Sequence, residues 1–78
     1  MHEYQITACW DEEARVWTAT SEDIQGLCLE AETLDGLISE ASVLIPELLA
    51  LNGQLSAKAT IPIPFRVTAE RTATTRVQ

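Results

Sequence analysis

The chain has 78 residues and a formal net charge of −7, and 46% of its residues are hydrophobic. A chain of this length forms a single domain that buries only about 60% of the surface exposed on unfolding, so self-association would add stability. The hydrophobic fraction excludes a disordered chain, and no apolar run approaches the roughly 18 residues of a membrane span. The N-terminal residues lack the basic and apolar regions of a signal peptide, so we expect a cytoplasmic protein without membrane contact.

The charge is distributed unevenly along the chain. Residues 1–57 contain eleven acids and one base, Arg15, for a net charge of −10, whereas residues 58–78 have a net charge of +3. An acidic body repels nucleic acid phosphates and attracts a basic protein. We therefore expect no nucleic acid partner. Solubility alone is the alternative explanation of the charge.

The N-terminal part of the chain predicts three strands. Residues 4–10 alternate between apolar and polar side chains, which is typical of a half-buried strand. Residues 15–20 are rich in β-branched and aromatic side chains, and residues 27–31 form a third short segment of this kind. Gly26 can adopt positive φ in the preceding loop, and Ile24 is expected to fold back onto the sheet. The short connections indicate an antiparallel meander.

A helix is predicted for residues 34–51, where apolar side chains recur at spacings of three and four. Thr33 stands directly before this run and is a suitable N-cap. Pro46 removes one backbone donor, which predicts a kink or interruption near residues 42–45.

The C-terminal part predicts one further strand over residues 65–71, where apolar and polar side chains alternate again. A proline-rich extended segment precedes it, since two prolines within residues 61–64 exclude a central strand there. Residues 1–71 would thus form one domain, and residues 72–78 a polar tail. The predicted fold is α+β, a two-layer β-β-β-α-β arrangement with the fourth strand parallel to the first, strand order 3-2-1-4, and the helix on one face.

Apolar periodicity also predicts which side chains are buried. The expected core comprises Ile6, Ala8, Val16, Leu27, Leu29, Leu37, Ile38, Ala41, Leu44, Ile45, Leu48, Phe65 and Val67. Cys9 and Cys28 are expected to be small buried apolar side chains rather than a disulfide. Trp10 and Trp17 flank the first hairpin, where they could pack against each other in the core or mark an interface.

Four segments carry a family resemblance. Residues 10–17 read W-D-E-E-A-R-V-W, residues 21–27 S-E-D-I-Q-G-L, residues 30–37 E-A-E-T-L-D-G-L and residues 45–52 I-P-E-L-L-A-L-N. This pattern resembles a group of short uncharacterised proteins related to HicB-like antitoxins. The resemblance implies a truncated ribonuclease-H-like sheet, dimers or higher assemblies, and binding to a small basic HicA-like toxin.

The resemblance does not extend to the DNA-binding module that usually follows in HicB antitoxins. The 26 residues after Asn52 contain two close prolines and no helical pattern. Operator binding is therefore not expected.

No catalytic or cofactor pattern stands out. His2 is the lone histidine, and no base lies within motif distance of any serine. Asp11, Glu12 and Glu13 are adjacent acids in a turn, where we expect them to be solvated. The glycines are isolated rather than arranged in a phosphate-binding loop. We therefore expect neither enzymatic activity nor a bound metal or cofactor.

The predicted function is a non-catalytic protein-binding module resembling a HicB-like antitoxin, which neutralises a small basic toxin ribonuclease. The residues expected to contact the partner are Trp17, Glu22, Asp23, Glu30 and Glu32. The alternative is a homo-oligomeric structural or regulatory protein without a toxin. In either case we expect self-association through a sheet edge or the proline-rich segment.

Overall fold

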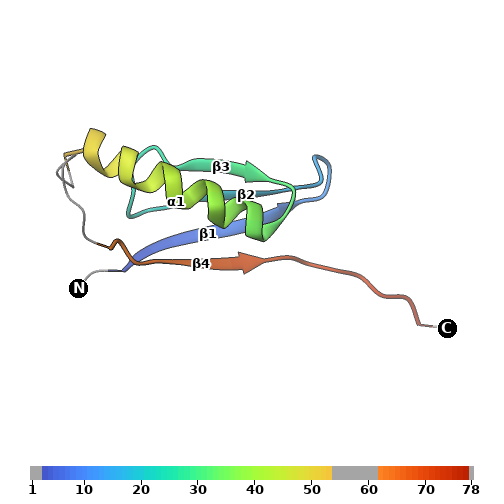
Figure 1. Cartoon of the computed structure of the whole chain (residues 1–78). Coiled ribbons are helices and arrows are strands. Elements are labelled where there is room, and N and C mark those ends of the chain that lie inside the picture. Colours follow the sequence, from blue (N-terminus) through green and yellow to red (C-terminus); the bar gives the residue numbers. More distant parts are fainter. Residues whose placement is uncertain (1–2, 54–61, 78) are drawn as a thin grey trace.

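One helix packs against one face of a four-stranded sheet in a computed structural model of the chain, which describes residues 3–53 and 62–77 (Figure 1). The helix, α1 (Leu34–Leu51), lies between the third and fourth strands in sequence. The C-terminal residues after the fourth strand extend away from the body (Figure 1). Among these described residues, no helix combines the length and apolar character that a membrane span requires.

The sheet has the strand order β3-β2-β1-β4. The central strand β1 (Tyr4–Asp11) pairs antiparallel with β2 (Val16–Thr20), which pairs antiparallel with β3 (Cys28–Ala31). The last strand, β4 (Phe65–Glu70), lies parallel to β1. The structure thus confirms the predicted α+β fold and the order 3-2-1-4.

The β2–β3 loop is tied to β1 through side-chain hydrogen bonds. The Ser21 hydroxyl donates to the Gln5 carbonyl (2.7 Å) and accepts from the backbone N–H groups of Asp23 and Ile24 (3.0 and 3.2 Å). The Asp23 carboxylate accepts from the Gln5 N–H (2.8 Å). This geometry turns Ile24 into the core, and Gly26 completes the turn with a φ of +84°. Both expectations for this loop are confirmed.

The helix begins at the predicted cap. The Thr33 hydroxyl accepts a hydrogen bond from the Gly36 N–H (2.9 Å), satisfying one of the donors left free at a helix N-terminus. The predicted interruption at Pro46 is wrong, because α1 continues without a break to Leu51. Pro46 and Ser42, whose carbonyl would have accepted the missing bond, both lie on the exposed side of the helix. Water can therefore satisfy that carbonyl.

Replacement of Thr33 by alanine is expected to lower the free energy of unfolding by about 0.5–2 kcal/mol, because the Gly36 N–H loses its acceptor. Replacement by serine keeps an acceptor at the same position and should cost only a few tenths of a kcal/mol. Urea titration of both variants measures the difference. Equal midpoints for the two variants would mean that the hydroxyl contributes nothing to the cap.

The core lies between α1 and the face of the sheet that α1 covers. Its helical part is a stripe with a spacing of four: Leu37, Ala41, Ile45 and Leu49. The sheet and its loops contribute Ile6, Ala8, Trp17, Ala19, Ile24, Leu27 and Leu29. Seven of the thirteen predicted core residues are therefore fully buried, and Trp17, Ala19, Ile24 and Leu49 join them.

The remaining predicted core residues are less buried than expected. Ile38 is 40% exposed, because it lies one position away from the buried helical stripe. Four of the others pack around the margin of the core and are half-buried: Leu44, Leu48, Phe65 and Val67. Val16 is also half-buried, but it precedes the buried Trp17 in β2 and therefore points to the uncovered face of the sheet. The helix is too narrow to cover the whole sheet.

The second face of the sheet carries mostly short polar side chains. Cys9 and Cys28 lie on this face and are exposed, so the expectation that they are buried is wrong. Strand alternation explains the error. Cys9 follows the buried Ala8, and Cys28 precedes the buried Leu29, so both cysteines point away from the helix. No element among residues 3–53 and 62–77 covers this face (Figure 1).

Candidate partner-binding surface

Trp17 belongs to the core rather than to an exposed contact surface. It is 9% exposed on the helix side of β2. Its ring packs edge-to-face against that of Trp10, with centroids 5.4 Å apart and an interplanar angle of 66°. The two tryptophans are directly opposite in the β1–β2 register. Of the two roles the sequence left open, core packing is the one in this structure, and Trp17 supplies no accessible anchor for a partner.

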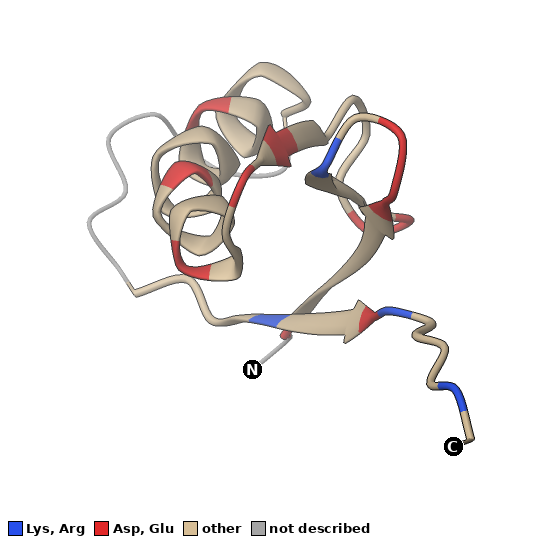
Figure 2. Cartoon of the chain, turned by 90° about the vertical axis from the view of Figure 1, so that its right-hand side faces the viewer, with Lys and Arg blue, Asp and Glu red and all other residues tan. Residues whose placement is uncertain are grey.

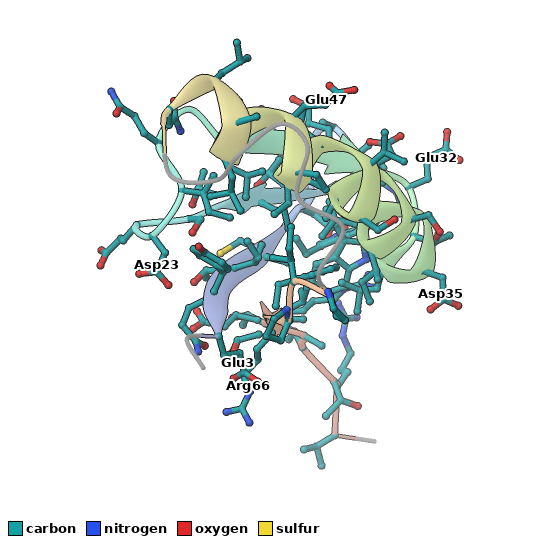
Figure 3. The ribbon with its side chains drawn as sticks, turned by 60° about the vertical axis from the view of Figure 1, so that its left-hand side comes forward. Glu3, Asp23, Glu32, Asp35, Glu47 and Arg66 are labelled. Carbon is teal, nitrogen blue, oxygen red and sulfur yellow. The ribbon has the colours of Figure 1, made fainter. Side chains whose placement is uncertain are left out.

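The four acidic residues predicted to contact a partner do not form one patch. Glu22, Glu30 and Glu32 are exposed, whereas Asp23 is half-buried and holds the β2–β3 loop to β1. Asp23 and Glu32 lie at opposite ends of the body (Figure 3). Glu30 points to the uncovered face of the sheet, because it follows the buried Leu29.

An apolar groove lies between α1 and β3. It has a volume of about 410 Å³ and is lined by Leu29, Ser39, Glu40, Val43, Leu44 and Glu47. Leu29 and Leu44 extend the core outward into this groove, and Val43 stands at its helical side with 66% of its surface exposed. The groove is shallow and open to solvent, and a partner's apolar side chain could pack into it against Val43.

Acidic side chains border the groove. Glu40 and Glu47 are exposed and lie two helical turns apart, about 10 Å along the axis, with Val43 between them. Figure 2 shows acidic positions along α1 and the segment leading into it, where no basic position lies; the β1–β2 turn and β4 carry both acidic and basic positions. Glu32, Asp35 and Glu47 all lie on the helix side of the body (Figure 3). The groove thus combines an apolar floor with a negative rim.

The spacing of three residues in the sequence indicates the helical side of this groove. Glu40, Val43 and Glu47 are spaced by three and four residues, so they share one helical face beside the buried stripe. The prediction instead followed the acids near the loop that carries the family resemblance. The depth of the groove depends on how α1 sits on β3, which periodicity does not specify.

The described acids do not gather into a group that could hold a metal ion. Among residues 3–53 and 62–77, no three His, Cys, Asp or Glu side chains come together closely enough to hold a metal ion. In the β1–β2 turn, Glu12 accepts a hydrogen bond from the Trp10 indole N–H (2.6 Å) and pairs with Arg15. Asp11 accepts from the backbone N–H groups of Glu13 and Ala14. These contacts within the turn give Asp11 and Glu12 a structural role.

Comparison with known proteins identifies a family. The chain matches the domain of unknown function DUF1902 over residues 3–78. It is also similar to a solved structure, the hypothetical protein TTHA1013 from the extremely thermophilic bacterium Thermus thermophilus, with a TM-score of 0.70 and 36% sequence identity over 97% of this chain and 100% of that chain. No curated protein matches the chain. Neither match names a HicB-like antitoxin. The chain belongs to the DUF1902 domain family.

Proposed function

We propose that this chain is a non-catalytic protein-binding module that resembles a HicB-like antitoxin and neutralises a small basic toxin ribonuclease. The observation that supports it most is the apolar groove between α1 and β3 with Glu40 and Glu47 at its rim. The net charge of −10 over residues 1–57 and the resemblance in residues 10–52 support the same class of partner.

The two components of the groove have different roles in this proposal. Its acidic rim speeds the encounter with a basic partner, because complementary charge acts mainly on the association rate. The apolar floor around Val43 and Leu44 holds the complex together, since desolvated apolar contacts dominate the dissociation rate. High salt should therefore slow binding without abolishing it.

A second candidate is a homo-oligomeric structural or regulatory protein that has no toxin partner. The strands β3 and β4 form the two edges of the sheet and leave backbone groups available for pairing. Self-association and binding at the groove are compatible, because β4 lies at the edge of the sheet away from the groove.

The test uses a purified small basic HicA-like toxin, which is mixed with the full chain. We expect the chain to inhibit the toxin's ribonuclease activity. The double variant E40K/E47K should lower the association rate constant at least about tenfold at low salt. Val43→Asp should chiefly raise the dissociation rate constant, because it places a charge on the apolar floor.

The matched control is E13K/E22K, which changes the net charge equally at exposed positions outside the groove. A smaller effect for this control assigns the interaction to the groove. Equal effects would remove the groove as the binding site, and a larger effect would favour the β2–β3 loop. If the toxin neither binds nor loses activity at micromolar concentrations, the antitoxin proposal fails and the homo-oligomer is favoured.

A further inference from the structure

The outer edge of β4 has unpaired backbone groups with a regular pattern. The Tyr4 N–H donates to the Pro64 carbonyl (3.1 Å), so residue 64 directs its carbonyl toward β1. Backbone direction alternates along a strand, and residues 66, 68 and 70 therefore also face β1. The N–H and C=O groups of Phe65, Val67 and Ala69 face the open edge. β1 is the one strand paired with β4 within the described ranges.

The helix side of β4 is also incompletely covered. Phe65 and Val67 are half-buried, and Ala69 is exposed, although all three lie on the same face of the sheet as the core. A gap of about 190 Å³ lies between α1 and β4, lined by Ser42, Ile45, Pro46, Ile63 and Phe65. Figure 1 shows α1 lying over β2 and β3, with β4 at the side of the body. Apolar surface therefore continues to the open edge.

We propose that β4 pairs antiparallel with β4 of a second copy of this chain, around a two-fold axis at Thr68. This register joins the two sheets into one and places Val67 opposite Ala69 of the second copy, so that both apolar margins become covered. The two α1 helices then flank a shared floor on the same side. The groove between α1 and β3 remains accessible at each outer edge, so this dimer does not depend on the proposed function.

Charge favours this register. Within its own chain Arg66 already pairs with Glu3 (Nε–Oε1 3.4 Å), so Glu70 of the second copy is a second acidic neighbour. With Thr68 on the axis, Arg66 lies opposite Glu70 of the second copy, twice in each dimer. Both residues face β1 with their backbone groups, so they form non-hydrogen-bonded pairs across the new interface, where side chains approach most closely. Shifting the pairing by two residues in either direction places Glu70 of one copy opposite Thr68 or Pro64 of the other, so the opposite charges no longer face each other. Shifts of four place Glu70 opposite Glu70 or Arg66 opposite Arg66, which are repulsive.

The opposite edge of the sheet is less suited to self-pairing. β3 has four residues, whereas β4 has six. Glu30 lies within β3 and Glu32 follows it, so two copies of this edge would bring acids together without a base. Short, charged edge strands disfavour pairing with a second copy.

Sedimentation velocity on the full chain tests the proposed dimer. At tens to hundreds of micromolar, we expect a species of twice the 8.6 kDa chain mass. The variants R66E and E70R each place like charges opposite each other in two pairs and should raise the dimer dissociation constant at least about tenfold. The combined variant R66E/E70R restores the opposite charges and should restore the dimer.

The control is R76E, which changes the net charge as R66E does but lies in the C-terminal tail. It should leave the dissociation constant unchanged. A dimer weakened by R76E and not by R66E would assign the interface to the tail and overturn the proposed register. A strict monomer at high micromolar concentration would overturn the dimer itself.

Ala69→Pro provides a second test that does not depend on charge. The Ala69 N–H faces the open edge, so proline leaves the β1–β4 hydrogen bonds in place and removes a donor to the second copy. We expect a monomer with an unchanged far-UV circular dichroism spectrum. A folded Ala69→Pro variant that remains dimeric would contradict pairing through β4.

Discussion

Replacement of Leu37 by alanine is expected to lower the free energy of unfolding by about 2–5 kcal/mol. Leu37 is fully buried in the first turn of α1, and its loss leaves a cavity that the surrounding side chains fill only in part. Domains of this kind have total stabilities of about 5–15 kcal/mol, so the variant loses a large share of its stability. Urea titration followed by circular dichroism measures the effect.

Leu51→Ala is the matched control for this experiment. It makes the same chemical change in the same helix, but Leu51 is 82% exposed. Its free energy of unfolding should change by no more than about 0.5 kcal/mol, as is usual for surface substitutions. Similar losses for the two variants would show that helix propensity, rather than burial, controls the result.

Replacement of Ile24 by alanine is expected to destabilise the fold by a similar amount, about 2–5 kcal/mol, although Ile24 lies in a loop. The loop connects β2 and β3, and the Ile24 side chain is fully buried in the core. The Ser21 hydroxyl donates to the Gln5 carbonyl and accepts from the Ile24 N–H, and the Asp23 carboxylate accepts from the Gln5 N–H. These hydrogen bonds hold the loop in the conformation that buries Ile24. The urea midpoint and the slope of the transition measure the loss.

Ile24→Val keeps most of the side chain and should cost only about 0.5–1.5 kcal/mol. An Ile24→Ala variant with the stability of the original chain would mean that the loop moves away from the core without penalty. In that case the Ser21 and Asp23 hydrogen bonds would not hold the loop either. The losses in free energy of unfolding for the two substitutions together measure how much the burial of Ile24 contributes to stability.

The binding surface proposed from the structure differs from the one predicted from the sequence. The sequence directed attention to Trp17 and to acids near the β2–β3 loop. In the structure, Trp17 is buried and Asp23 holds the loop, while Glu40, Val43 and Glu47 border an apolar groove. Burial of an aromatic side chain depends on which face of the strand meets the helix, and a strand of five residues does not encode that by itself.

The sequence by itself determined the elements and their order. Residues alternate in β1 and β4 and recur at spacings of three and four in α1, and both patterns depend on local geometry. The sequence therefore placed all five elements within a few residues of their observed bounds. Gly26 and Thr33 likewise carry local conformational preferences that the structure confirms. The strand order followed because short connections and a right-handed crossover leave few arrangements for so short a chain.

Only the tertiary structure decided which apolar side chains the single helix covers. Rotation of α1 about its axis buries the stripe from Leu37 to Leu49 and leaves Ile38 and Val43 exposed, although all of them fit a helical apolar pattern. One helix is narrower than four strands, so the edges at β3 and β4 retain accessible apolar surface. The two cysteines face solvent because the single helix covers one face of the sheet and they lie on the other. Residues on the uncovered face alternate along the strand as those in the core do, so alternation alone does not show which face is buried.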